Sequence, residues 1–144
     1  MQEKTLVLLK PDLVTGNLIG TVLAAYEEQA LKIEALQLLC PERAKVEAHY
    51  VEHVGRPYYE RLVNGITGQP VVAVVLSGDE AISRVRTLNG ATDPAKAEPQ
   101  TIRGRFALSM AQNSVHASDS SANAVREIAI WFGSALCSDS TARC

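Results

Sequence analysis

The sequence predicts an α+β fold, a ferredoxin-like split βαβ sandwich in which helices cover a four-stranded antiparallel sheet. Two continuous apolar runs, Thr5–Leu9 and Val71–Leu76, have the composition of buried strands. The expected elements follow one another as β-α-β, a helical insertion, and then β-α-β-α. No linker or repeat interrupts this order, so we expect residues 1–144 to form a single domain.

The first part of the chain supplies two strands and the helix between them. The run Thr5–Leu9 ends at Lys10-Pro11-Asp12, which is typical of a turn. Apolar side chains then recur at helical spacing over Leu18–Ala30, with acidic residues on the opposite face. Leu31–Cys40 alternates like a strand but slips once in phase, which predicts a β-bulge.

A helical insertion and the second βαβ unit follow. Pro41 suits the first turn of a helix that we expect to run to about His53. The pattern predicts further helices over Tyr58–Asn64, Asp79–Asn89 and Ser121–Phe132, and a fourth strand over Phe106–Met110. Two segments, Ala91–Arg105 and Ala111–Ser120, are expected to lack regular structure, and long ordered loops in a small domain are usually functional.

Composition limits the possible classes of protein. Hydrophobic residues make up 47% of the chain, enough for a core without disulfides, and no apolar run approaches the roughly 20 residues that span a bilayer. Met1–Lys4 does not begin a signal peptide, so we expect a cytoplasmic protein. Cys40, Cys137 and Cys144 form no metal-binding pair or disulfide framework, which favours reduced thiols. The net charge of -2 argues against general nucleic-acid binding.

One histidine, His116, lies in a polar stretch between an expected strand and an expected helix. Its imidazole should therefore be exposed. A histidine in such a place is more often a solvated loop residue than a catalytic one, so its position alone assigns it no role.

The residues around His116 favour a catalytic role over that of a solvated loop residue. Asn113-Ser114-Val115-His116-Ala117-Ser118-Asp119 closely resembles the active-site signature of nucleoside diphosphate kinases, Asn-x-x-His-Gly-Ser-Asp, with one departure at Ala117. Between Thr5 and about Gly133, further blocks resemble the same family in the same order: Lys10-Pro11-Asp12, Tyr50, Arg56–Tyr59, Gly68–Val72, Gly90–Pro94, Thr101–Gly104 and Glu127–Phe132. So many separated blocks make the resemblance far more specific than any single motif.

The resemblance implies an activity. Nucleoside diphosphate kinases move the γ-phosphoryl group of ATP to nucleoside diphosphates in a ping-pong cycle, which here implies a phosphohistidine on His116. Mg²⁺ is implied as the companion of the nucleotide, bound through the phosphates and not by a dedicated protein site. The family forms hexamers or tetramers, so a homo-oligomer is implied, with the tail 134–144 a candidate for subunit contacts.

The resemblance also implies roles for individual residues. Glu127 is implied to hydrogen-bond the far ring nitrogen of His116, and Tyr58 to stack on the base, where the family usually has phenylalanine. Binding of the phosphates and ribose is implied for Lys10, Arg86, Thr92, Arg103 and Asn113. Supporting positions are Tyr50, Leu62, Met110, Ser118 and Asp119, and of these we expect Asp119 to cap the last helix.

The chemistry of these residue types fits the implied reaction. Phosphoryl transfer depends mainly on neutralising the charge spread over the moving group, and Lys10, Arg86 and Arg103 each lie near an element end facing a loop. A neutral imidazole is nucleophilic near pH 7 without a separate base. We therefore expect the three cationic side chains and His116 to share one pocket.

Departures from the family pattern leave one alternative open. Ala117 replaces the usual glycine, and a positive φ at this residue would be unfavourable by about 1 kcal/mol. Asp93, Gln100 and Arg105 also depart, beside the expected pocket. These differences motivate the alternative of a catalytically weakened nucleotide-binding or scaffold protein of the same family.

Other classes have less support. An RNA-binding sandwich of similar topology needs aromatic side chains on central strands, and Val71–Leu76 has none. The sequence contains no P-loop, and Gly16–Gly20 is not a dinucleotide fingerprint. His49 and His53 have the i, i+4 spacing that can present two imidazoles to a metal, but without a nearby third ligand we expect exposed polar residues there.

Overall fold

The computed structural model describes residues 1–107 and 114–133. Within them the strands form one four-stranded antiparallel sheet in the order β2-β3-β1-β4. The strands are β1 (Gln2–Leu9), β2 (Lys32–Leu39), β3 (Val71–Asp79) and β4 (Val115–Ala117). Because β3 lies between β1 and β2, and β1 between β3 and β4, both βαβ units are split, which confirms the predicted fold class.

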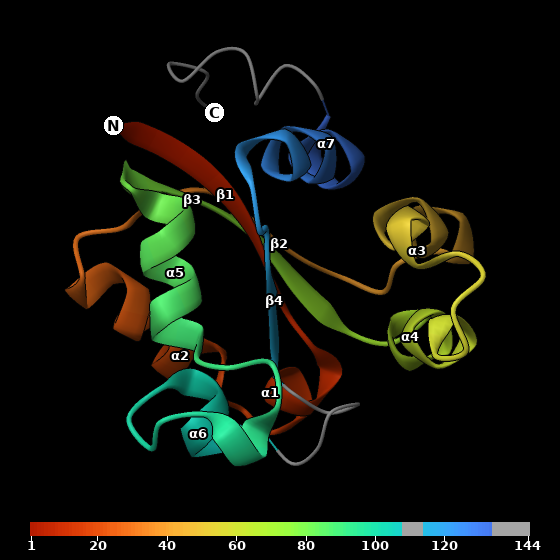
Figure 1. Ribbon diagram of the computed structural model, residues 1–144, viewed down its shortest axis with the longest axis horizontal. Helices are drawn as coiled ribbons and strands as arrows, with labels where there is room; N and C mark the ends of the chain where they lie inside the picture. Colours follow the sequence, from red (N-terminus) through yellow and green to blue (C-terminus); the bar gives the residue numbers. More distant parts are fainter. Residues whose placement is uncertain (108–113, 134–144) are drawn as a thin grey trace.

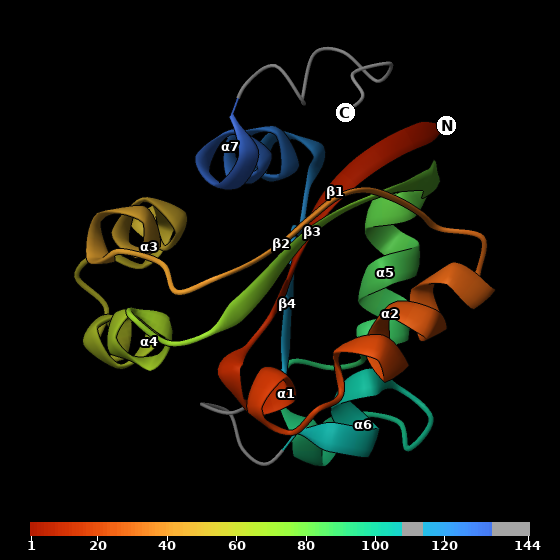
Figure 2. The ribbon, with the colours of Figure 1, turned by 180° about the vertical axis from the view of Figure 1, so that it is seen from behind.

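The helices cover both faces of this sheet. They are α1 (Pro11–Thr15), α2 (Ile19–Glu28), α3 (Arg43–His49), α4 (Tyr59–Ile66), α5 (Ala81–Asn89), α6 (Ile102–Phe106) and α7 (Ser121–Phe132), with 3-10 turns η1 (Val51–His53) and η2 (Pro94–Lys96). Figure 1 shows the sheet nearly edge-on, with α2, α5 and α6 on one side and α3, α4 and α7 on the other. The view from behind in Figure 2 shows the same two layers.

Two hydrophobic cores result from the alternation of side chains along the central strands. Leu6 and Leu8 of β1 pack in the core under α3, α4 and α7, whereas Val7 and Leu9 pack in the core under α2 and α5. All four side chains are completely buried. This burial on both faces explains why β1 and β3 are continuous apolar runs in the sequence.

Several predicted elements are confirmed. The last helix has the predicted bounds, and α2 lies inside the predicted range Leu18–Ala30. The predicted bulge in β2 is present as a register shift between Ile33 and Ala35. None of the helices in the described residues has the length and apolar character that crossing a membrane requires.

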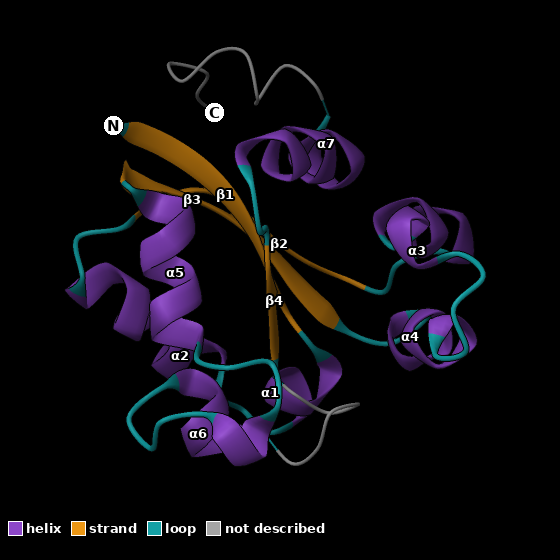
Figure 3. Ribbon diagram, viewed as in Figure 1, coloured by secondary structure: helices purple, strands orange, loops and turns teal. Residues whose placement is uncertain are grey.

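The prediction of a fourth strand over Phe106–Met110 was wrong for residues 106 and 107, the part of this range that the structure describes. Phe106 is the last residue of α6, and residues 108–110 lie outside the described part of the chain. The fourth strand is instead β4, the short strand paired with β1 in Figure 3, within a stretch that was expected to be irregular. A strand of three residues with a polar centre carries too little apolar alternation to be recognised in the sequence.

The expected irregular segment Ala91–Arg105 also contains regular structure. Two side-chain caps organise it: Asp93 accepts a hydrogen bond from the backbone N–H of Ala95, and Thr101 accepts one from that of Gly104. These caps begin η2 and α6, which are too short to show helical periodicity.

Several element boundaries differ from the prediction. The helix expected to begin at Pro41 begins at Arg43, after Glu42 as its N-cap. Asp79 ends β3 and does not begin the next helix, because Glu80 adopts a left-handed conformation with φ of 52° before α5. The helix predicted to run to His53 ends at His49 and continues as η1. Pro11 begins the short helix α1 where only a turn was predicted, since proline is suited to the first helical position.

The first prediction concerns the double-sided core. Val74 is fully buried on β3, so Val74→Ala should lower the free energy of unfolding by about 2 kcal/mol, through lost burial and a residual cavity. Urea unfolding measures this change. The matched control is Val54→Ala at a side chain 62% exposed, which should shift stability by less than about 0.5 kcal/mol. Equal effects of the two substitutions would contradict the core described above.

Candidate active site

A cavity of about 430 Å³ gathers most of the residues singled out in the sequence. Its walls come from both helical layers and from β4, so residues far apart along the chain meet there. The predicted site residues on its walls are Lys10, Tyr50, Tyr58, Leu62, Arg86, Thr92, Arg103, His116, Asp119 and Glu127. Ser118 is buried close behind the cavity, whereas Met110 and Asn113 lie outside the described residues.

His116 is the central residue of β4 and does not lie in a loop. It is paired with Leu8 of β1, and hydrogen bonds on both sides extend the pairing: Lys10 N–H to the carbonyl of Ser114 at 2.8 Å, and Ser118 N–H to the carbonyl of Leu6 at 3.0 Å. The side chain is only 23% exposed, so the prediction of an exposed imidazole in a loop was wrong. The backbone of the histidine is fixed by the sheet, while part of its ring reaches the cavity.

Glu127 of α7 holds one nitrogen of this ring. His116 Nε2 lies 2.8 Å from Glu127 Oε1. A carboxylate can only accept a hydrogen bond, so this contact assigns the hydrogen to Nε2 and leaves the lone pair of the neutral ring on Nδ1. In this arrangement Nδ1 is chemically able to act as a nucleophile.

Two other side chains hold Glu127 itself. Ser118 Oγ donates a hydrogen bond to Oε1 at 2.8 Å, and Arg126 Nη2 lies 3.5 Å from Oε2. The side chain of Glu127 is only 5% exposed. Because both carboxylate oxygens have polar partners, this buried acid is fixed in position before any substrate arrives.

Ala117 does not strain the backbone beside the nucleophile. It lies in β4, opposite Val7, and its φ is not positive. The positive φ in this region belongs to Ser114, at 74°. The conformational penalty that motivated a catalytically weakened protein is therefore absent at Ala117.

Buried positive charge marks the side of the cavity near β1. Lys10 and Arg103 are each 8% exposed. Burial, together with the positive charge of Arg103, lowers the pKa of Lys10 to about 8. Arg103 donates hydrogen bonds to the carbonyls of Gly90 at 2.6 Å and Val115 at 2.7 Å, which fix its guanidinium between α5 and β4.

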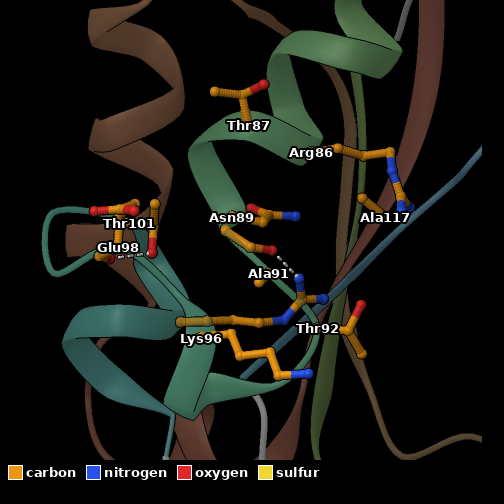
Figure 4. Close-up of a pocket in the computed structure, with 11 residues that line it drawn as sticks. Arg86, Thr87, Asn89, Ala91, Thr92, Lys96, Glu98, Thr101 and Ala117 are labelled. Carbon is orange, nitrogen blue, oxygen red and sulfur yellow. Dashed lines mark hydrogen bonds between the residues drawn. The ribbon is translucent and has the colours of Figure 1, made fainter.

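A second cavity, of about 410 Å³, adjoins this cationic wall. Arg86, Thr92, Arg103 and Ala117 line both cavities, so they form the boundary between them. Figure 4 shows Arg86 on α5 and Thr92 on the loop that follows it, with Lys96 also lining the hollow. Three cationic side chains, Arg86, Lys96 and Arg103, therefore line this second cavity.

The opposite end of the cavity is aromatic. Tyr58 precedes α4, and its hydroxyl lies 2.9 Å from Nδ1 of His53. Leu62 from the next turn of α4 lines the cavity beside it. Tyr50 is nearly buried, and burial with the negative charge of Glu127 raises the pKa of its hydroxyl. The cavity thus has a cationic end and an aromatic end, and His116 lines the same cavity.

Asp119 does not cap α7 as expected. The cap is Ser120, whose side chain accepts a hydrogen bond from Asn123 N–H at 3.1 Å. Asp119 instead accepts one from the Asn123 side-chain amide at 2.6 Å, and this bond lowers the pKa of Asp119. Its carboxylate lies on the cavity wall as an ionised group.

His49 was not predicted to belong to this site. His49 was expected to be an exposed polar residue but is only 3% exposed, and it packs against the His116 ring at a centroid distance of 4.4 Å. The signal was present: Val46, His49 and Tyr50 share one face of α3 by the i, i+3, i+4 rule, and all three are buried. Arg126 was also missed, because an arginine near a helix middle carries no local signal.

The group of His49, His116 and Glu127 resembles a metal site in composition alone. Their potential ligand atoms lie within 4.8 Å of one another. However, Trp131 Nε1–H donates to His49 Nδ1 at 3.1 Å, so the hydrogen of neutral His49 is on Nε2. A protonated nitrogen cannot bind a metal, and His116 Nε2 is already bonded to Glu127. This hydrogen-bond pattern fits a positioned nucleophile better than a metal centre.

Comparison with known proteins identifies similar chains. The family model described as nucleoside diphosphate kinase matches residues 3–136. A nucleoside diphosphate kinase of Clostridium perfringens is 51% identical over 130 residues, covering 90% of this chain and 91% of the relative. One of Corynebacterium diphtheriae is 51% identical over 133 residues, covering 92% and 98%. The crystal structure of the Aquifex aeolicus nucleoside diphosphate kinase has a TM-score of 0.89 at 36% identity, covering 92% of this chain and 96% of that one.

The second prediction concerns the buried charge of Lys10. The unfolded chain keeps the Lys10 proton up to about pH 10.5, whereas the folded chain releases it at about 8. The unfolded state therefore binds more protons between these values, and the wild-type protein should gain stability from Lys10 as pH rises from 8 to 10.5. Lys10→Met should remove this gain and raise the free energy of unfolding at pH 7 by about 2 kcal/mol.

Urea unfolding at pH 7.0 and 9.5 tests this prediction. The matched control is Lys32→Met, at a side chain 63% exposed, which should follow the wild-type pH dependence. A Lys10→Met protein that is less stable than wild type at pH 7, with an unchanged pH dependence, would contradict the unfavourable burial of this charge.

Proposed function

This chain belongs to the nucleoside diphosphate kinase family, the enzymes that transfer phosphate between nucleotides, and we propose that it does so through a phosphohistidine on His116. In the proposed ping-pong cycle, ATP phosphorylates the histidine and ADP leaves before a nucleoside diphosphate accepts the group. The observation that carries this proposal is the 2.8 Å contact between His116 Nε2 and Glu127, which leaves Nδ1 as the nucleophile.

Each half of the cycle balances without an external acid or base. The Nδ1 lone pair forms a bond to the γ-phosphorus as the bond from that phosphorus to the bridging oxygen breaks, and ADP departs with that electron pair. The hydrogen on Nε2 stays in its bond to Glu127, whose negative charge offsets the positive charge gained by the ring. A terminal phosphate oxygen of the second nucleotide then attacks the phosphorus, and the nitrogen–phosphorus bond breaks.

The cationic wall is proposed to bind the phosphates. Lys10, Arg86 and Arg103 line the same cavity as His116. Their positive charge would stabilise the negative charge that spreads over the oxygens of the phosphoryl group during transfer. An arriving phosphate would favour the protonated form of Lys10, so binding offsets the unfavourable burial of this charge. Thr92 lines the same wall as a hydroxyl donor, and Asn113 is proposed to contact phosphate or ribose by resemblance to the family.

The aromatic end is proposed to bind the base by stacking. The ring of Tyr58 offers a face that any base can stack on, which suits an enzyme that accepts both purine and pyrimidine nucleotides. Leu62 lines the cavity beside it, and Met110 is proposed to lie opposite by resemblance. His53 holds the tyrosine hydroxyl and so restrains the ring.

Mg²⁺ is proposed to enter with the nucleotide. The wall of the cavity offers a carboxylate at Asp119, whose pKa is lowered, so an ionised oxygen faces the site where a metal bound to phosphates would need one. When bound, the metal would neutralise phosphate charge and orient the phosphate chain. The nucleotide phosphates would hold it, and Asp119 lines the cavity as a nearby negative charge.

Self-association is proposed through the edge of the sheet. β2 is an edge strand, and two of its leucines, Leu36 and Leu38, are 51% and 61% exposed. An exposed apolar edge strand is a surface that another strand can pair with and cover, so a second copy of the chain is the proposed partner.

We also propose that the enzyme acts in the cytoplasm, where the exposed thiol of Cys40 would stay reduced.

The third prediction tests the phosphohistidine. Incubation with γ-labelled ATP and Mg²⁺ should produce an acid-labile, alkali-stable phosphoprotein, because phosphoramidates hydrolyse in acid. Any nucleoside diphosphate should discharge this label. His116→Gln should abolish both labelling and turnover, whereas the control His53→Gln should still be labelled. A label that persists in His116→Gln would overturn the proposal.

The fourth prediction tests self-association. The double substitution Leu36→Asp with Leu38→Asp places charge on the proposed interface and should reduce the molar mass measured by light scattering after size exclusion. Val54→Asp, at another exposed apolar residue, should leave the mass unchanged. A wild-type protein that is monomeric at micromolar concentration, or a double variant of unchanged mass, would contradict the proposed edge-strand interface.

A further inference from the structure

The inference concerns His49, a buried histidine behind the proposed nucleophile, and it rests on the proposed function of His116. His49 ends α3 and lies between Trp131 of α7 and His116 of β4. It is only 3% exposed. Its ring meets the His116 ring at 79° with a centroid distance of 4.4 Å, an edge-to-face contact of the kind that aromatic rings prefer.

Trp131 fixes the protonation pattern of His49. An indole N–H can only donate, and Trp131 Nε1 lies 3.1 Å from His49 Nδ1. Nδ1 therefore accepts, and the hydrogen of the neutral ring must be on Nε2. Burial, reinforced by the charges of Arg126 and Lys10 and by the neighbouring imidazoles, holds the pKa of His49 well below its usual value, so the ring stays neutral.

The Nε2–H group of His49 has no hydrogen-bond partner in the described residues, although it is shielded from solvent. An unpaired buried donor is unfavourable by about 1–3 kcal/mol and is uncommon away from functional sites. The His49 ring packs on the ring of His116, and potential ligand atoms of His49, His116 and Glu127 lie within 4.8 Å of one another. A buried polar side chain with an unpaired donor thus lies close to the proposed catalytic pair.

The proposed nucleophile needs a second restraint. Its single strong tether, from Nε2 to Glu127, fixes one point of the ring but permits rotation about that hydrogen bond, since the outer torsion of histidine is broad. Such a rotation would turn Nδ1 away from the phosphorus. Misplacement of a reacting atom by about 1 Å can lower a rate by about 100-fold.

We propose that His49 is a positioning residue for the phosphoryl transfer: held by Trp131 as the Nε2-protonated ring, it packs edge-to-face on His116 and fixes the direction of Nδ1. Glu127 and His49 then restrain the His116 ring from two directions, one through a hydrogen bond and the other through contact with a planar group that the hydrogen bond from Trp131 holds in place. His49 acts through His116 and requires no contact with the nucleotide.

The groups that face His49 come from every element packed against it. α7 contributes Trp131, Arg126 and Glu127, and β4 contributes His116. Lys10, which follows β1, and His53 of η1 complete the set. Arg126 donates to the carbonyls of Ala48 at 3.0 Å and His49 at 3.5 Å, which ties the end of α3 to α7. The histidine is therefore held by its backbone as well as by its side chain.

Three variants separate a positioning role from a purely structural one. His49→Phe keeps a ring but removes both nitrogens, so it loses the anchor to Trp131. His49→Gln is the conservative rescue, because its planar carboxamide can accept the hydrogen bond from Trp131 and still pack against the His116 ring. Trp131→Phe removes the anchor while leaving His49 in place, and it also serves if His49→Phe does not fold.

The measurement is the single-turnover rate of His116 phosphorylation by ATP with Mg²⁺, alongside the affinity for ADP. His49→Phe should slow phosphorylation by about tenfold or more, while the Kd for ADP stays within about twofold of wild type, because only the direction of Nδ1 changes. His49→Gln should recover most of the rate. Trp131→Phe should slow phosphorylation by about threefold or more, again without loss of ADP affinity.

Several outcomes would overturn the inference. These are a wild-type phosphorylation rate in His49→Phe or Trp131→Phe, a His49→Gln protein no faster than His49→Phe, or a loss of ADP affinity that parallels the loss of rate. The parallel loss would show that His49 supports the pocket as a whole. Absence of phosphorylation in the wild-type protein would instead overturn the proposed function, and this inference with it.

Discussion

The hydrogen bond between His116 Nε2 and Glu127 Oε1 joins the shortest strand of the sheet to the last helix, and the rest of the site is arranged around it. The strand pairing of β4 with β1 fixes the backbone of His116, while α7 packs across the same sheet face and presents Glu127. Ser118 and Arg126 hold the two oxygens of the acid. Because β4 holds His116, α7 holds Glu127 and Arg126, and Ser118 is bonded to the backbone of Leu6, the orientation of the imidazole is defined without a ligand.

The double-sided sheet explains how a small domain supports such a site. β1 and β3 are buried on both faces, so the two hydrophobic cores stabilise the end of β1, which Lys10 directly follows. That stability permits unfavourable local features: a buried lysine with a pKa lowered to about 8 beside a buried arginine, and a buried imidazole donor that has no partner among the described residues. Such features are expected where charge must be ready for an anionic substrate, since stability is commonly lost at functional sites.

The site also shows why similar residue types have different roles. All three histidines of the chain line one cavity. His116 is bonded to a carboxylate, His49 to an indole N–H, and His53 to a tyrosine hydroxyl. Only the first arrangement produces a ring with a carboxylate behind one nitrogen and a lone pair on the other. The partner of each ring, and not the residue type, decides whether it can act as a nucleophile.

The sequence by itself determined the fold class, the central strands and the last helix, because these depend on hydrophobic periodicity that is local to each segment. It also determined the family, through blocks spread from Thr5 to Gly133, and so singled out His116 and Glu127. Only the tertiary structure decided that His116 lies on a strand, that Ser120 caps α7, and that His49 packs against the His116 ring. A three-residue strand carries no local pattern of its own, because pairing with β1 creates it. The helical spacing of Val46, His49 and Tyr50 indicates a buried face, but it cannot show that Trp131 and His116 are the partners of His49, because they come from distant parts of the chain.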